Sequence, residues 1–327
     1  MNIFLSIFKL FPPELSHSIA LNSLNILNKL KILHLFVSNL KSENHEIHGL
    51  ILKNKLGTAA GLDKNGDFID CLGELGFGFL EVGTVTPLPQ AGNTKPRVFR
   101  LFNEQAVINR LGFNNKGIDH LVKNLKKRKF DGVVGVNIGA NKESRNQKRI
   151  DDYLKCLRKI STLSDYITIN ISSPNTPGLR DLHNQENIKK LVSSIQLEVN
   201  RVNFLGPIFL KISPDEPFEL IKNIAEIVEK SSFTGLIVSN TTISKDSLKN
   251  KKNQIIEGGL SGAPLMDKST DLLKRLNDKY PNLTLIGAGG VMTKSDFNKK
   301  ILSGASLVQI YTGFIIKGPK IVEEILN

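Results

Sequence analysis

Short runs rich in β-branched residues alternate with longer helical runs from about residue 47 onward, and this alternation constrains the fold more than any other feature. It is typical of parallel strands joined by crossover helices. Strands are predicted at Leu56–Ala60, Gly78–Thr84, Gly132–Ile138, Tyr166–Ile171, Ile208–Ile212, Gly235–Ser239, Leu283–Ala288 and Ser306–Ile310. Helices are predicted between them at Asp67–Leu75, Ile118–Lys126, Asp151–Leu163, Ile188–Val202, Phe218–Lys230, Thr270–Lys279 and Lys294–Ser303.

Eight strand–helix units in about 270 residues predict an α/β fold of the (β/α)8 TIM-barrel class. A doubly wound open sheet is the alternative, but no GxGxxG motif follows the first strand. The segment Phe99–Phe113 breaks the alternation and is expected to be an inserted pair of strands, a kind of insertion that usually serves function. The predicted domains are an N-terminal helical extension, residues 1–46, and a barrel, residues 47–327.

The extension has the pattern of two short amphipathic helices. Apolar residues at i, i+3, i+4 and i+7 predict one helix, which a Pro-Pro pair ends: Phe4, Ile7, Phe8 and Phe11, then Pro12 and Pro13. A second helix is expected from near Glu14, with one apolar side formed by Ala20, Leu24, Leu27 and Leu30. Lysines flank these residues, so the segment fits a membrane interface, and it fits a helical pair packed on the barrel equally well.

Two kinds of leader or anchor are not expected. No run of 18 apolar residues is present, so no membrane-spanning helix is predicted. The first residues lack a positively charged start and a small-residue cleavage site, which disfavours a secretory signal.

The formal net charge of +13 suits nucleic acid, an anionic membrane or an anionic ligand. Lys exceeds Arg, and Asn and Ile are abundant, so an AT-biased genome explains part of the excess. The densest basic run, Lys123–Lys129, is expected at an exposed helix end without interleaved aromatics, so nucleic acid is not an expected partner. Cys71 and Cys156 fall in predicted helices as buried thiols. His45 and His48 lack a third ligand nearby, so no metal site is expected.

Polar residues gather at the carboxyl ends of the predicted strands, where active sites of such barrels lie. They are Ala60–Lys64, Thr84, Asn137, Asn170 with Ser172–Gly178, Lys211, Ser239–Thr242, Gly287–Gly290 and Tyr311–Gly313. Each one alone is explained by a turn from strand to loop. Together, two lysines and several amides with almost no carboxylates favour an anionic, planar, carbonyl-rich ligand.

Glycines after the seventh and eighth strands mark a phosphate corner. Gly287–Gly290 and Thr312-Gly313 lie where such barrels commonly bind phosphate, and Gly258–Gly262 could contribute. Glycines let backbone N–H groups approach phosphate oxygens closely. The pattern predicts a phosphorylated ligand over the barrel mouth, and FMN and a phosphorylated substrate fit it equally.

Eight strings occur in order between about Leu56 and Pro319: AAGLDKNG, EVGTVTPLPQAGNTKPR, NRLGFNN, INISSPNTPGLR, SNTT, GGLSGAPL, IGAGG and SLVQIYTGFIIKGP. With them the chain resembles the membrane-associated, quinone-using class of the dihydroorotate dehydrogenase family. The resemblance implies oxidation of dihydroorotate to orotate in de novo UMP synthesis, with FMN as cofactor and a membrane quinone as acceptor. It also implies peripheral attachment to an anionic membrane, at the cytoplasmic side of the cell inner membrane.

The resemblance also implies residue roles. Substrate contacts would be Lys64, Asn109, Arg110, Leu111, Gly112, Phe113, Asn170, Asn175, Asn240 and Thr241. FMN contacts would be Ala60, Gly61, Leu62, Asp63, Lys64, Thr84, Asn137, Asn170, Lys211, Ser239, Gly262, Gly290, Tyr311 and Thr312. His17 is a tentative contact of the quinone, and an apolar helical pair would give the quinone a route from the bilayer.

Ser173 would be the catalytic base, where the soluble classes have Cys, so serine points to the quinone-using class. It would remove a proton from substrate C5 while a hydride leaves C6 for flavin N5, with a proton path through Thr176 or water. Three alternatives are a different acceptor such as fumarate or NAD, another phosphate-binding barrel enzyme, and a non-catalytic membrane-binding barrel. The serine at position 173 and the N-terminal extension argue against a different acceptor. The asparagine set with Lys211 argues against another phosphate-binding enzyme. Every expected site residue is present, which argues against a non-catalytic barrel.

Overall fold

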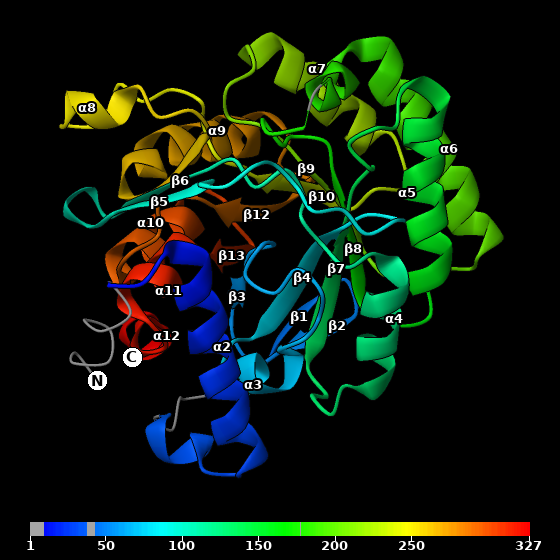
Figure 1. Cartoon of the computed structure of the whole chain (residues 1–327). Helices are drawn as coiled ribbons and strands as arrows, with labels where there is room; N and C mark the ends of the chain where they lie inside the picture. The colour runs from blue at the N-terminus through cyan, green and yellow to red at the C-terminus, as the bar shows by residue number, and fades with distance from the viewer. Residues whose placement is uncertain (1–9, 38–42, 177) are drawn as a thin grey trace.

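The computed structural model describes residues 10–37, 43–176 and 178–327 and contains a closed barrel of eight parallel strands (Figure 1). In barrel order they are β10 (Gly235–Val238), β12 (Thr284–Ala288), β13 (Leu307–Ile310), β3 (Leu56–Thr58), β4 (Phe79–Val85), β7 (Val133–Ile138), β8 (Tyr166–Asn170) and β9 (Ile208–Lys211). All eight predicted strands are present, so the predicted barrel is confirmed and the open sheet is wrong.

Helices cover the outside of the barrel. They are α3 (Ile69–Gly73), α4 (Ile118–Lys127), α5 (Asn146–Ile160), α6 (Gln185–Arg201), α7 (Phe218–Glu229), α9 (Met266–Lys279) and α10 (Lys294–Leu302). Short α8 (Lys251–Gln254) and the C-terminal α11 (Thr312–Lys317) and α12 (Lys320–Leu326) complete the set. Cys71 in α3 and Cys156 in α5 are buried, as predicted. The lysines of the basic run Lys123–Lys129 are exposed at the end of α4, also as predicted.

Two helices begin earlier than predicted. Helix α5 begins at Asn146 rather than near Asp151. Its first turn is polar in sequence, so the inward-facing position of the buried Arg149 could not be recognised from an apolar pattern. Helix α9 begins at Met266 rather than Thr270, because the buried Met266 and Ser269 extend its inner face toward the barrel.

A hairpin closes the end of the barrel at which the strands begin. Strands β1 (His45–Ile47) and β2 (Leu50–Leu52) form it, and Nε2 of His48 lies 2.6 Å from Oγ1 of Thr284 at the start of β12. Inside this end, the rings of Phe79, Tyr166 and Phe209 pack edge to face with centroids 6.2 and 5.8 Å apart. A ligand site is therefore left to the opposite end, where the strands finish.

A three-stranded sheet lies over that opposite end (Figure 1). Strands β5 (Val98–Leu101) and β6 (Ala106–Asn109) are the predicted inserted pair. The third strand, β11 (Gly259–Gly262), pairs antiparallel with β6 and was expected only as a glycine-rich loop. Buried Leu260 packs this strand onto Ala106 and Ile108, so the insertion has its own small apolar core.

Helix α2 (Pro13–Lys29) and the 3-10 turn η1 (Leu33–Phe36) form the described part of the extension, and α2 confirms the second predicted helix. Leu21 and Leu33 are buried, and Leu24 and Leu27 pack against the barrel core. Leu30, predicted on that inner side, is exposed, because it caps the helix one turn above the exposed Ile26.

The extension exposes several large apolar side chains, namely Leu10, Phe11, Leu15, Ile26, Leu30, Leu35 and Phe36. Polar residues are exposed among them, namely Ser18, Asn22, Ser23, Lys29, Lys31 and His34. The predicted first helix falls mostly on residues outside the described part, namely Phe4, Ile7 and Phe8. None of the described helices combines the length and apolarity that crossing a bilayer requires.

Candidate active site

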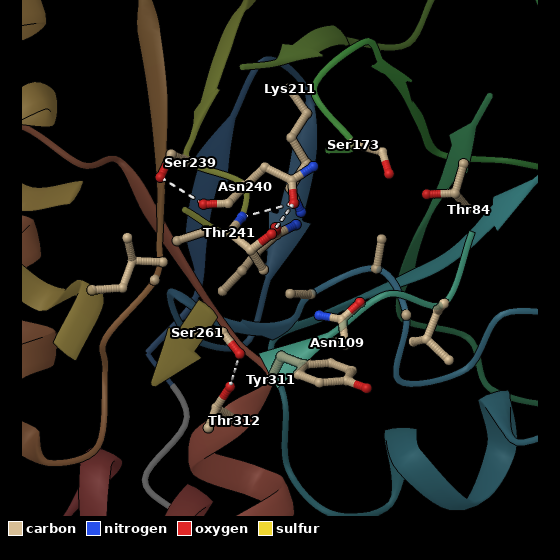
Figure 2. Close-up of a pocket in the computed structure, with 18 of the residues that line it drawn as sticks. Thr84, Asn109, Ser173, Lys211, Ser239, Asn240, Thr241, Ser261, Tyr311 and Thr312 are labelled. Carbon is tan, nitrogen blue, oxygen red and sulfur yellow. Dashed lines mark hydrogen bonds between the residues drawn. The ribbon is translucent and has the colours of Figure 1, made fainter. Parts of the chain in front are cut away.

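A cavity opens at the carboxyl ends of the strands, beneath the β5–β6–β11 sheet, with an empty volume of about 1010 Å³ that includes its open mouth. Figure 2 shows side chains from opposite walls of the barrel turned toward this space. The predicted residues that line it are Ala60, Gly61, Lys64, Thr84, Asn109, Leu111, Gly112, Phe113, Asn170, Ser173, Asn175, Lys211, Ser239, Asn240, Thr241, Gly262, Gly290, Tyr311 and Thr312.

Two predicted FMN contacts lie behind the cavity wall, in the loop after β3. Leu62 is buried, and its carbonyl oxygen lies 2.9 Å from Nε2 of His17. The carboxylate of Asp63 accepts three backbone N–H groups within its own loop, the shortest from Phe68 at 2.7 Å. Burial raises the pKa of Asp63 to about 6. Both residues therefore shape the loop that carries Gly61 and Lys64, instead of facing the cavity.

Arg110 and Asn137 also stand back from the cavity. The guanidinium of Arg110 lies over the ring of Phe99 and pairs with the exposed Glu257 at 3.4 Å, on the outer side of the inserted sheet. Asn137 is fully buried on β7, behind Thr84. Asn137 can still act on a ligand through its hydrogen bond with Thr84. The side chain of Arg110 is turned away from the cavity.

A hydrogen-bonded chain of polar side chains crosses the barrel floor beneath the cavity. Thr84 donates to Oδ1 of Asn137 at 2.6 Å, and Asn170 donates to Oγ1 of Thr84 at 3.0 Å. Asn137 in turn donates to Oε1 of Glu81 at 2.9 Å. These bonds fix the orientation of the amides, and an amide that presents both donor and acceptor suits a carbonyl-rich heterocycle.

Glu81 anchors this chain and was not foreseen from the sequence. Its Oε2 accepts from Tyr166, Thr168 and Gln309 at 3.1, 2.9 and 2.8 Å. We expect Glu81→Gln to lower the free energy of unfolding by about 2 kcal/mol, because the amide would oppose one of these buried donors. Urea unfolding followed by circular dichroism measures this. The matched change Glu229→Gln, at the exposed end of α7, should shift the value by less than about 0.5 kcal/mol.

Backbone N–H groups gather at the predicted phosphate corner. Gly289, Gly290, Thr312 and Gly313 line the cavity, and within the described residues no hydrogen-bond acceptor is found for the N–H of Gly290, Thr312 or Gly313. At Gly290, φ is +88°, and an added Cβ would lie 2.2 Å from Cα of Met266. Only glycine fits there, and a cluster of N–H groups of this kind is suited to binding an anion.

Ser261 adds a hydroxyl to this corner and was missed as a site residue. It lines the cavity from β11 and accepts a 2.8 Å hydrogen bond from Thr312 (Figure 2). Its place between Leu260 and Gly262 on an alternating strand is the signal that could have found it, once this segment is treated as a strand.

Two lysines supply positive charge, and no Asp or Glu lines the cavity among the residues that the structure describes. Lys211, at the end of β9, is buried; burial lowers its pKa, and Glu81 opposes that shift. Lys64 is partly exposed to the cavity, and desolvation lowers its pKa to about 8, with Glu14 opposing that shift. The cavity therefore favours an anionic ligand at neutral pH.

Ser173 lies in the loop after β8, is nearly buried and lines the cavity. Its Oγ accepts the backbone N–H of Asn175 at 3.3 Å, and no imidazole or carboxylate contacts it among the described residues. Nδ2 of Asn175 donates to the carbonyl of Asn109 at 3.2 Å, which ties this loop to the inserted sheet. Oγ1 of Thr176 is buried with no partner in the described part of the chain.

Helix α2 packs behind the cavity wall, where Nε2 of His17 contacts the carbonyl of Leu62 in the loop after β3. Glu14 pairs with the buried Arg97 at 2.7 Å, a contact that the sequence did not indicate. Burial and then the charge of Lys64 lower the pKa of His17 to about 4, so its ring is neutral. Burial, followed by Glu14, raises the pKa of Tyr311 to about 12. The extension thus places polar groups behind the cavity wall, while its exposed side carries large apolar side chains.

Comparison with known proteins gives concordant matches. A family profile described as dihydroorotate dehydrogenase matches residues 43–327. The chain is 46% identical to a Saccharophagus degradans protein named dihydroorotate dehydrogenase (quinone), over 97% of this chain and 95% of the relative. It is 44% identical to one of the same name from Teredinibacter turnerae, over 95% and 94%. A structure of the Eimeria tenella enzyme in complex with ferulenol superposes with a TM-score of 0.87 at 34% identity, covering 95% and 89% of the chains.

Proposed function

Because the chain belongs to the dihydroorotate dehydrogenase family of oxidoreductases, we propose that it oxidises dihydroorotate to orotate for pyrimidine synthesis. The proposed cofactor is FMN and the proposed acceptor is a membrane quinone. The observation that carries the proposal is one cavity that joins an anion corner, a fixed amide set, two lysines and Ser173. The names of the relatives supply the substrate and the acceptor.

The residues present fit FMN. The free N–H groups of Gly290, Thr312 and Gly313 would hold its phosphate, and the buried amides would meet its carbonyl-rich ring. When bound, FMN would take up a hydride from the substrate and later release the electrons to the acceptor. Lys211 supplies a fixed positive charge at the barrel floor, where it would stabilise negative charge in that ring.

The substrate would lie between Ser173 and the amides of Asn109, Asn175 and Asn240, the last of which donates to Ser172 at 2.9 Å. Ser173 would remove the proton from the carbon next to the carbonyl. A neutral hydroxyl is a weak base, so it needs a route for that proton. The buried hydroxyl of Thr176, in the same loop, has no partner in the described part of the chain and is a candidate for that route. Lys64 would offset the developing negative charge.

The acceptor would reach the cavity from the side of α2. The apolar outer face of the extension suits the surface of a bilayer, and Lys29 and Lys31 at its edge suit anionic headgroups. Tyr311 lines the cavity and His17 contacts Leu62 behind its wall, so a route on this side would pass these two residues. This arrangement supports peripheral attachment to an anionic membrane surface, which we propose to be the cytoplasmic side of the inner membrane.

The test is an anaerobic titration of the purified protein with dihydroorotate, followed by the absorption of oxidised flavin. The band should bleach and should return on addition of a quinone, but not of fumarate or NAD. If the protein is yellow but does not bleach, the substrate assignment is refuted. If the protein takes up no FMN, the cofactor assignment is refuted.

The charge of Lys64 should make orotate binding depend on pH. Because the pKa of Lys64 is about 8, its ammonium is charged below that pH and neutral above it. The affinity for orotate should therefore be constant below about pH 7 and fall by up to tenfold per pH unit above pH 8. Titration of the oxidised protein with orotate at pH 6.5–9.5 measures this. Lys64→Met should flatten the profile, whereas the exposed Lys95→Met should keep it.

A further inference from the structure

Lys300 on α10 has no exposed surface, and the mechanism above does not use it. Its ammonium hydrogen-bonds Oγ of Ser269 on α9 at 2.6 Å, and no carboxylate pairs with it among the described residues. Burial lowers its pKa to about 7. A buried cation without a counter-ion is costly in free energy, so a negative charge arriving nearby from outside the chain would stabilise the charged form of Lys300.

The nearby charged side chains have other partners. Asp296, on α10, accepts from the N–H of Met292 at 3.0 Å and from Thr293. Asp267, on α9, pairs with the exposed Lys299 at 2.9 Å. Neither carboxylate forms an ion pair with Lys300 among the described residues, so an anion on the inner side of α9 would favour its charged form.

Ser269 connects Lys300 to the phosphate corner. Its Oγ lies within hydrogen-bond distance of the carbonyls of Leu265, Met266 and Gly289, at 2.8, 3.2 and 3.0 Å. The contact with Gly289 shows that this carbonyl is directed toward α9. In a trans peptide the C=O and the following N–H point in opposite directions. The N–H of Gly290 is therefore directed away from α9, toward the cavity that Gly289 and Gly290 line.

We propose that Lys300 is a positioning residue for the phosphate group of the flavin cofactor, acting through Ser269 and the Gly289–Gly290 peptide. It holds that peptide with its N–H toward the phosphate and places a positive charge behind it. This role rests on the proposed function, because it requires FMN as the ligand. The recognised chemistry is a phosphate monoester dianion, not the isoalloxazine ring.

The test compares FMN with riboflavin, which has the same ring and no phosphate. Holoenzyme is equilibrated with increasing riboflavin, and the ratio of the two affinities is read from the flavin released. In Lys300→Met the preference for FMN should fall about tenfold, while riboflavin binding stays within about twofold. Lys299→Met is the matched control, since it removes the neighbouring, exposed charge, and its ratio should equal that of the wild type.

Ser269→Ala provides a second variant if Lys300→Met does not fold, and it should lower the same ratio in the same direction. An unchanged ratio in a folded Lys300→Met protein would overturn the proposal, as would equal weakening of both flavins, which indicates general damage. If the wild-type protein itself showed no preference for FMN over riboflavin, the cofactor assignment would fall, and this role with it.

Discussion

Replacement of Ser173 by alanine is expected to slow reduction of the flavin by dihydroorotate about 10²–10⁴-fold, the usual contribution of a positioned base. FMN should remain bound, because the anion corner and the amide chain do not involve this hydroxyl. Anaerobic stopped-flow absorption measures the rate of bleaching directly. The loss should fall on the limiting rate and not on the dihydroorotate concentration for half-saturation.

Two further variants sharpen this experiment. Ser164→Ala removes another buried serine hydroxyl, one that donates to Ile160 far from the cavity, and should leave the bleaching rate unchanged. Ser173→Cys restores an ionisable group at the same atom and should recover part of the rate, with a steeper pH dependence. Bleaching of the alanine variant at the wild-type rate would refute the assigned base.

Loss of the apolar face of the extension should reduce turnover with a bilayer-borne quinone by 10²-fold or more. Leu15, Ile26 and Leu30 are 47%, 57% and 62% exposed. Changing all three to glutamine removes the burial of three apolar side chains in the membrane interface, at roughly 1.5 kcal/mol or more each. Co-sedimentation with anionic lipid vesicles and quinone-dependent turnover in the same vesicles measure the effect. Bleaching by dihydroorotate should not change.

The matched control changes three exposed leucines elsewhere, Leu197, Leu205 and Leu302, to glutamine. Vesicle binding and turnover should then equal those of the wild type. Equal losses in the two triple variants would contradict the membrane interpretation. Deletion of residues 1–40 is a blunter test of the same idea, because it also removes Leu21 from the core and Glu14 from Arg97.

The barrel was predictable because its strands are buried on both faces and therefore appear as short apolar runs at regular spacing. Tyr166–Asn170 and Ile208–Lys211 are buried at every position and were found within two residues of their ends. Strand β11 was not predicted, since Gly259 and Gly262 resemble a loop and its partner β6 lies far away in the sequence. Long-range pairing of that kind leaves no local periodicity.

Some residues of the candidate site could likewise be predicted from the sequence, and others could not. Residues at the carboxyl ends of strands, such as Thr84, Asn170 and Lys211, could be expected at the cavity from position alone. Glu81 could not, because a carboxylate inside a strand is indistinguishable by pattern from an exposed one until its four donors come together in space. The pairing of Arg97 with Glu14 joins the insertion to the extension and is equally invisible to local analysis.

The closed base of the barrel makes this protein convenient for site-specific attachment. Its two thiols are buried, and burial raises the pKa of Cys71 to about 12 and that of Cys156 further, so neither reacts readily with maleimides. A cysteine introduced at the exposed Glu46 in the β1–β2 hairpin would be the single accessible thiol. A dye or an electrode linker coupled there would sit at the end remote from every ligand. All immobilised molecules would then have the same orientation, with the open end of the cavity facing the solution, which suits electrochemistry.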